Sequence, residues 1–206
     1  FSRLLVNGTM SAEFQYVRDV TVNETHIDDD EFGKIYPLFG NEIYTTNFTC
    51  GRDAIKSAAK TETATVVAGE EVGNGRYNNT IFHDGPAQVF MSEASSSDLE
   101  AYAGYQGDCF KIAEWLAKNA TKWIIDDDSG RQKITDLNFT IPSSTPPGKY
   151  LLRVEQWSYS PYLQFYVNCA QIDLVGPGGG NPIGFAKFPG SYDYKAIDSG
   201  KLFAKF

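Results

Sequence analysis

The sequence predicts an all-β protein, an antiparallel immunoglobulin- or fibronectin-like β-sandwich with long loops and little helix. Many short segments alternate apolar and polar residues, turns rich in Gly and Pro separate them, and helical periodicity is scarce. The 206 residues suffice for two packed sheets around one core, and no linker or repeat divides them. We therefore expect a single domain over residues 1–206.

The expected strands are rich in β-branched and aromatic residues. The first, residues 4–6, runs into Asn7-Gly8, a strong turn pair. Further strands are expected at residues 62–68, 87–91, 134–141, 149–156 and 163–175. In the last of these, one face carries Leu163, Phe165, Val167 and Cys169, and the other carries Gln164, Tyr166 and Asn168.

The remaining segments are less regular. Residues 97–103 suggest one or two helical turns behind a serine cap, and residues 111–119 fit a helix or a strand. Residues 9–46 form a long irregular stretch. Residues 176–180 are a Gly-rich loop, but no helix and no Gly-Lys-Ser/Thr follows, so they predict no phosphate site.

Charge and sequons bear on the partner and the compartment. A net charge of −8 argues against nucleic acid and against an anionic membrane surface. No apolar run approaches the roughly 20 residues of a membrane span. Six Asn-x-Ser/Thr sequons are more than chance placement gives, so we expect a secreted glycoprotein. We also expect a monomer. The sequons begin at Asn7, Asn23, Asn47, Asn78, Asn119 and Asn138.

Residues 146–189 carry a resemblance to a known family. The pattern PG-x-YLLR-x-E is followed by QFY-x-x-CAQ, a Gly-rich loop and FPG-x-Y. This order resembles the fungal lytic polysaccharide monooxygenases of auxiliary activity family nine. Those enzymes cut cellulose and related glycans with one copper ion held by two histidines.

The resemblance implies a site. His83, in a His-x-Gly-Pro motif, matches the second copper-binding histidine, and imidazole nitrogen suits copper. Tyr166 matches the axial tyrosine, and Gln164 matches the glutamine that helps to hold an oxygen species. The resemblance also pairs Cys50 with Cys169. Cys109 then remains as a buried thiol or an intermolecular link, and its apolar neighbours favour the buried thiol.

Two departures argue against copper chemistry. Phe1 falls about three residues beyond the expected first histidine, as though the chain resembled the branch in which arginine replaces that histidine. The family also places a histidine between the last two strands. Residues 156–162 contain none, Ser160 falls at that position, and His26 is the only other histidine. Since lost outer groups weaken metal sites, we expect no copper brace and no copper, unless the first histidine precedes Phe1.

Aromatic side chains suggest a glycan-binding face, because aromatic rings offer apolar contact with a polar handle. Tyr192 matches the family's exposed glycan-stacking tyrosine, and Tyr194 can share its face. Tyr159, Tyr162 and Trp157 are weaker candidates of the same kind.

Three functions remain open. The favoured one is a copper-free, glycan-binding accessory protein that binds plant cell-wall polysaccharide or oligosaccharide such as cellulose or xylan. The second is an active copper monooxygenase, and the third is a non-catalytic cell-wall or partner-binding protein. The sequence has no Gly-x-Ser-x-Gly elbow, and Asp126–Gly130 lacks the spacing of a calcium loop. A pair of glycosidase carboxylates stays open, because their spacing is spatial.

Overall fold

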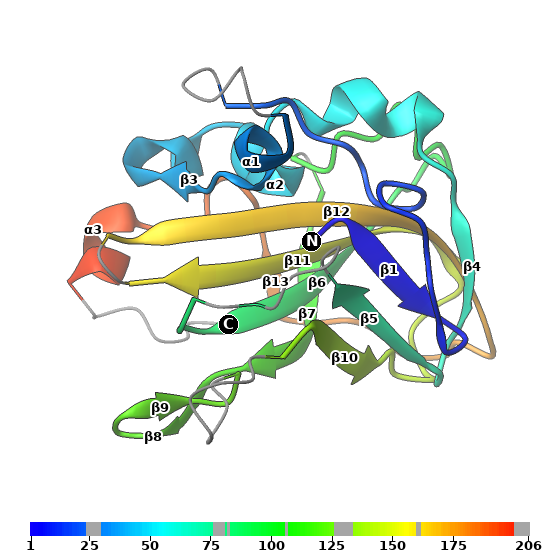
Figure 1. Cartoon of the computed structure of the whole chain (residues 1–206). Coiled ribbons are helices and arrows are strands. Elements are labelled where there is room, and N and C mark those ends of the chain that lie inside the picture. The colour runs from blue at the N-terminus through cyan, green and yellow to red at the C-terminus, as the bar shows by residue number, and fades with distance from the viewer. Residues whose placement is uncertain are drawn as a thin grey trace.

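The computed structural model of the chain is a sandwich of two mainly antiparallel sheets, which confirms the predicted fold class (Figure 1). It describes residues 1–23, 30–75, 81, 83–105, 107–125, 134–159 and 162–199. No helix within these ranges is long and apolar enough to cross a membrane.

The smaller sheet contains the hairpin that forms at the predicted Asn7-Gly8 turn. Its strands run in the order β10 (Asp136–Thr140), β5 (Glu71–Gly75), β1 (Arg3–Val6) and β2 (Thr9–Met10). Asn7 and Gly8 have φ angles of 52° and 70°, the left-handed pair that a tight hairpin turn requires. The Asn-Gly turn prediction is therefore confirmed.

The larger sheet forms the centre of the molecule. Its strands run in the order β13 (Phe185–Ala186), β7 (Cys109–Trp115), β6 (Ala87–Glu93), β11 (Gly148–Ser158), β12 (Gln164–Val175) and β3 (Leu38–Phe39). The predicted strand at residues 62–68 is present as β4 (Ala64–Val67). It pairs in parallel with β12, and the sequence did not predict this pairing.

Two open segment predictions are resolved. Residues 111–119 are extended, as β7 and as β8 (Ala117–Asn119), which pairs with β9 (Lys122–Trp123). The helix expected at residues 97–103 is wrong. The Asp98 carboxylate there accepts the backbone N–H groups of Glu100 and Ala101 and closes a turn instead.

The larger sheet is buried on both faces. Its inner face packs on the smaller sheet through an apolar core that includes Leu4, Val72, Met91, Leu152 and Ile172. Its outer face carries a second cluster that includes Phe90, Trp157 and Phe165, together with Phe48 and Phe188 from outside the sheet. The long strands β11 and β12 are therefore almost continuously buried, unlike strands with one solvent face.

Short helices cover the outer face (Figure 1), and the first two of them lie within residues 9–46, which were predicted to be irregular. They are α1 (Asp30–Ile35), η2 (Gly40–Tyr44), α2 (Asn47–Cys50), η3 (Ala54–Lys60) and α3 (Tyr194–Asp198). The predicted disulfide between Cys50 and Cys169 is present and ties α2 to β12. It closes 119 residues, for which chain entropy gives about 4–5 kcal/mol. Cys109 is a buried free thiol, as expected.

Candidate functional site

The inner face of the larger sheet changes character along β12. Ala170, Ile172 and Leu174 belong to the apolar core between the sheets. Alternate residues of a strand share a face, so Asn168, Tyr166 and Gln164, nearer the start of β12, lie on this same face. A polar strip thus replaces the core at this end of the sheet.

The neighbouring strand extends this polar strip. The register places Gln156 opposite Tyr166 and Ser158 opposite Gln164, and both β11 residues are buried. Gln156 Nε2 donates to the carbonyls of His83 and Trp157, and most buried polar side chains in proteins are satisfied in this way.

The structure brings the three predicted site residues together. The rings of His83 and Tyr166 are stacked, with centroids 5.4 Å apart and planes 23° apart. The Tyr166 hydroxyl donates a 2.7 Å hydrogen bond to Gln164 Oε1. His83 and Tyr166 are half-buried, so the stacked imidazole and phenol rings lie near the surface.

The turn that carries His83 is fixed against β11. Gln156 Nε2 donates to the His83 carbonyl at 3.0 Å, and the backbone N–H of Trp157 donates to the Pro86 carbonyl at 2.9 Å. A Cβ on Gly85 would lie 2.0 Å from the Trp157 carbonyl oxygen, so the turn reaches the strand only because this residue is glycine.

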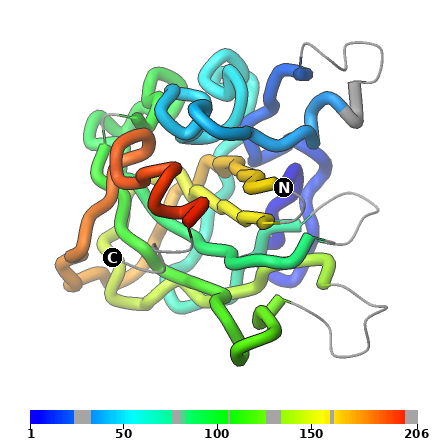
Figure 2. Tube along the Cα trace, turned by 90° about the vertical axis from the view of Figure 1, so that its left-hand side faces the viewer, coloured from blue at the N-terminus to red at the C-terminus, as the bar shows by residue number. Residues whose placement is uncertain are grey.

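The first residue of the chain lies beside the same strip. The Phe1 nitrogen donates to Asn168 Oδ1 at 2.9 Å, two residues along β12 from Tyr166. Figure 2 shows the N-terminus beside the yellow strands of the larger sheet. The start of the described chain and the stacked pair of His83 and Tyr166 therefore lie along the same strip of β12.

The donors present fit part of a copper site. In the described ranges, no group of three His, Cys, Asp or Glu side chains gathers that could hold a metal ion. His83 supplies one imidazole, a ligand that suits copper, and Tyr166 supplies a phenol beside it. His26 and Ser160 lie outside the described residues.

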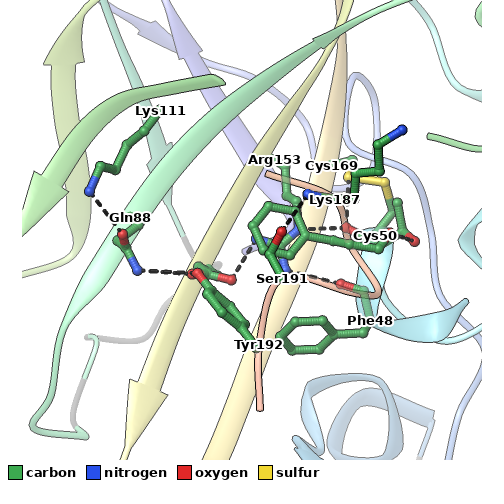
Figure 3. Close-up of polar contacts among 12 residues, drawn as sticks. Phe48, Cys50, Gln88, Lys111, Arg153, Cys169, Lys187, Ser191 and Tyr192 are labelled. Atoms are coloured by element: carbon green, nitrogen blue, oxygen red, sulfur yellow. Dashed lines mark hydrogen bonds and ion pairs between the residues drawn. A yellow bond between two sulfur atoms is a disulfide. The ribbon is translucent and has the colours of Figure 1, made fainter. Parts of the chain in front are cut away.

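Tyr192 lies on the other side of the sheet, and its predicted exposure is wrong. Only 5% of Tyr192 is exposed. Its hydroxyl donates a 2.5 Å hydrogen bond to Glu155 Oε1, and Gln88 Nε2 donates to the same oxygen at 3.1 Å (Figure 3). Burial, followed by the Glu155 charge, raises the pKa of Tyr192 well above its usual value. A ring enclosed in this way cannot stack on a sugar.

Arg153 completes this buried network. Its Nη1 lies 2.5 Å from Glu155 Oε2, and its other nitrogens donate to the carbonyls of Thr49 and Phe48. The guanidinium carbon lies 3.8 Å from the centroid of the Phe188 ring. Because hydrogen bonds and an aromatic face satisfy both charges, the ion pair holds α2 and the C-terminal segment against the sheet.

Other aromatic side chains are exposed near the polar end of the sheet. Tyr194 is half-buried at the start of α3, and its backbone N–H donates to the hydroxyl of Tyr44, which is 49% exposed. Tyr162 is 71% exposed. Trp157 is buried, so its predicted role on a glycan face is wrong.

The sequence analysis missed two aromatic residues of this region. Trp123 stacks on Tyr159 with ring centroids 6.2 Å and planes 6° apart, which docks the β8–β9 hairpin on the end of β11. Burial raises the pKa of Tyr159 to about 12. Tyr44 was missed because the stretch from 9 to 46 has no periodicity that shows which side chains face solvent.

Comparison with known proteins matches residues 1–204 to the model of Auxiliary Activity family 9 (formerly GH61). The "AA9 family lytic polysaccharide monooxygenase U" of Thermothielavioides terrestris is 47% identical over 202 residues, which cover 92% of this chain and 75% of that protein. The "AA9 family lytic polysaccharide monooxygenase G" of Aspergillus tamarii is 35% identical over 205 residues, which cover 93% of this chain and 57% of that protein.

Solved structures share the fold. A glycoside hydrolase family 61 member from Hypocrea jecorina superposes with a TM-score of 0.71 at 21% identity, covering 98% of this chain and 91% of that chain. A cellulose-active polysaccharide monooxygenase from M. thermophila gives a TM-score of 0.69 at 20% identity, covering 94% and 86%.

Proposed function

The chain belongs to Auxiliary Activity family 9, and from this premise we propose that it is a copper-dependent monooxygenase of plant cell-wall polysaccharides. The sequence analysis ranked this function second. The relatives are named monooxygenases, which favours it over the copper-free protein.

The observation that carries the proposal is the stacked pair of His83 and Tyr166, with Gln164 bonded to the phenol. These are the residues that the family resemblance assigns to copper and oxygen. They converge from a turn and a strand that are 81 residues or more apart in the chain (164 − 83 = 81). Residues that served only the core would not need an imidazole and a phenol at the surface.

The bound copper would supply the oxidising chemistry that breaks an unactivated C–H bond of the glycan. His83 would provide one ligand nitrogen, and Tyr166 would occupy the neighbouring position through its phenol oxygen. Gln164 keeps the phenol oriented by accepting the hydrogen bond of its hydroxyl at Oε1. Gln156 fixes the backbone of His83 by donating a hydrogen bond to the His83 carbonyl.

The substrate would lie across this end of the sandwich. The exposed side chains of Tyr44 and Tyr162 and the half-buried Tyr194 offer rings for pyranose faces. The Trp123–Tyr159 pair borders the same end. We expect a flat polysaccharide such as cellulose or xylan to contact these rings, as predicted for Tyr194 but with Tyr44 in place of Tyr192.

The test is a calorimetric copper titration of the full-length secreted protein, with its N-terminal residue identified by mass spectrometry. We expect tight one-to-one binding, together with release of oxidised oligosaccharides from cellulose in the presence of a reductant. His83→Ala removes both. His26→Ala, which replaces the only other histidine of the sequence, is the matched control and leaves both unchanged.

Protein that takes up no copper specifically but is retained on cellulose would contradict the proposal. That outcome would establish the copper-free glycan-binding protein that the sequence analysis favoured. Protein that neither takes up copper nor binds glycan would point to a cell-wall or partner-binding role.

A further inference from the structure

The β8–β9 hairpin carries a glycosylation sequon at its turn. Asn119 ends β8, Ala120 and Thr121 form the two-residue turn, and Lys122 begins β9. Figure 1 shows this hairpin projecting from the body of the sandwich. Asn119, Ala120 and Thr121 are all exposed, so an enzyme can approach the acceptor residue and the hydroxyl residue together.

The turn also orders the sequon. Asn119 Oδ1 accepts two hydrogen bonds, from the backbone N–H of Thr121 at 2.9 Å and from its hydroxyl at 3.1 Å. This is an Asx turn, in which the asparagine side chain bonds the backbone two residues on. Two donors on the carbonyl oxygen polarise the amide, and in the described part of the chain no hydrogen bond engages the amide nitrogen.

Two other sequons lack this arrangement. At Asn47, Oδ1 accepts the backbone N–H of Asp53, and the hydroxyl of Thr49 is buried and donates to the Phe188 carbonyl at 2.6 Å. Asn138 lies on the edge strand β10 with its Oδ1 over Gly73, where a Cβ would be 2.1 Å away.

Asn7 is the nearest competitor. It also occupies an exposed turn, with Gly8 and Thr9, but no described hydrogen bond joins its side chain to Thr9. Asn119 is thus the described sequon in which exposure, turn position and an ordered hydroxyl coincide.

We propose that Asn119 is an N-glycosylation site and is more fully occupied than Asn47. Asn119 Nδ2 loses a proton and forms a bond to the anomeric carbon of a lipid-pyrophosphate-linked oligosaccharide. The bond between that carbon and the pyrophosphate oxygen breaks, and the lipid pyrophosphate leaves with the electron pair. The reaction needs passage through a eukaryotic secretory compartment, for which the Cys50–Cys169 disulfide argues independently.

Site occupancy tests the proposal directly. The full-length protein is secreted from a fungal host, and its glycopeptides are analysed by mass spectrometry after enzymatic release of N-glycans in heavy-oxygen water. We expect the Asn119 peptide to carry the heavy-oxygen label in most molecules, and the Asn47 peptide to carry it in a smaller fraction.

Variants separate recognition from folding. Thr121→Val keeps the side-chain shape but removes the hydroxyl, and should abolish occupancy at Asn119 as completely as Asn119→Gln does. Thr135→Val, an exposed threonine outside any sequon, should leave occupancy at Asn119 unchanged. An unmodified Asn119, or occupancy at Asn119 no higher than at Asn47, would overturn the proposal.

Discussion

Replacing Tyr192 with phenylalanine tests whether this tyrosine anchors the fold or binds glycan. Phenylalanine keeps the ring, whose centroid lies 5.0 Å from that of Trp157 and 5.1 Å from that of Phe188. What is lost is the 2.5 Å hydrogen bond to Glu155. A hydrogen bond to a charged group contributes about 1.5–3 kcal/mol. Because Gln88 still donates to the same oxygen, we expect the free energy of unfolding to fall by about 2 kcal/mol.

Urea unfolding with the disulfide intact measures this loss. With a slope of about 2 kcal/mol per molar urea, the midpoint should fall by about 1 M at unchanged slope. Tyr194→Phe is the matched control, because Tyr194 is half-buried and its described hydrogen bond comes from the backbone N–H, which the substitution keeps. This variant should change the free energy of unfolding by less than about 0.5 kcal/mol. Equal effects of the two variants, or lost cellulose binding at unchanged stability in Tyr192→Phe, would refute the buried anchor.

Three further predictions concern the site turn and alkaline pH. Gly85→Ala places a Cβ against the Trp157 carbonyl at a φ of 152°, and should lower the free energy of unfolding by about 2–3 kcal/mol in urea. Gln156→Leu removes the donor to the His83 carbonyl and should weaken copper binding by about 10-fold in calorimetry, which unchanged affinity would contradict. Burial raises the pKa of Tyr150 to about 12, so its neutral form favours the folded state. That stability is fully present below the unfolded pKa of about 10 and lost as pH rises through 12. Circular dichroism should show Tyr150→Phe losing less stability across this range than the unaltered protein, and equal losses would count against the assignment.

The strands were predictable because alternation along the chain reports the pleat directly. Gln164, Tyr166 and Asn168 share a face for this reason, and the structure keeps them there. The short helices were missed because α2 and η2 have 4 and 5 residues, too few to establish a 3.6-residue period. Strand β4 was predicted, but its parallel partner was not, since pairing depends on residues far away in the chain.

Tyr192 shows where local sequence reasoning fails. The FPG-x-Y motif matches it to a tyrosine that is exposed in the family, and this match alone predicted an exposed ring. What buries it is Glu155, 37 residues away, whose carboxylate needs a donor because it lies 0% exposed beside Arg153. A family motif matched this tyrosine by position, but only the three-dimensional partner decides whether its hydroxyl faces solvent or the core.

The polar residues on the two faces of the larger sheet thus have different roles. On the outer face, Arg153 and Glu155 are enclosed and satisfied by carbonyls, hydroxyl and aromatic ring, so they stabilise the packing of α2 and the C-terminal segment. On the inner face, the half-buried rings of His83 and Tyr166 lie near the surface at the start of β12, beside polar side chains that are buried. Loss of copper binding in His83→Ala with retained stability, set against loss of stability in Tyr192→Phe, would show that chemistry and folding reside on opposite faces of one sheet.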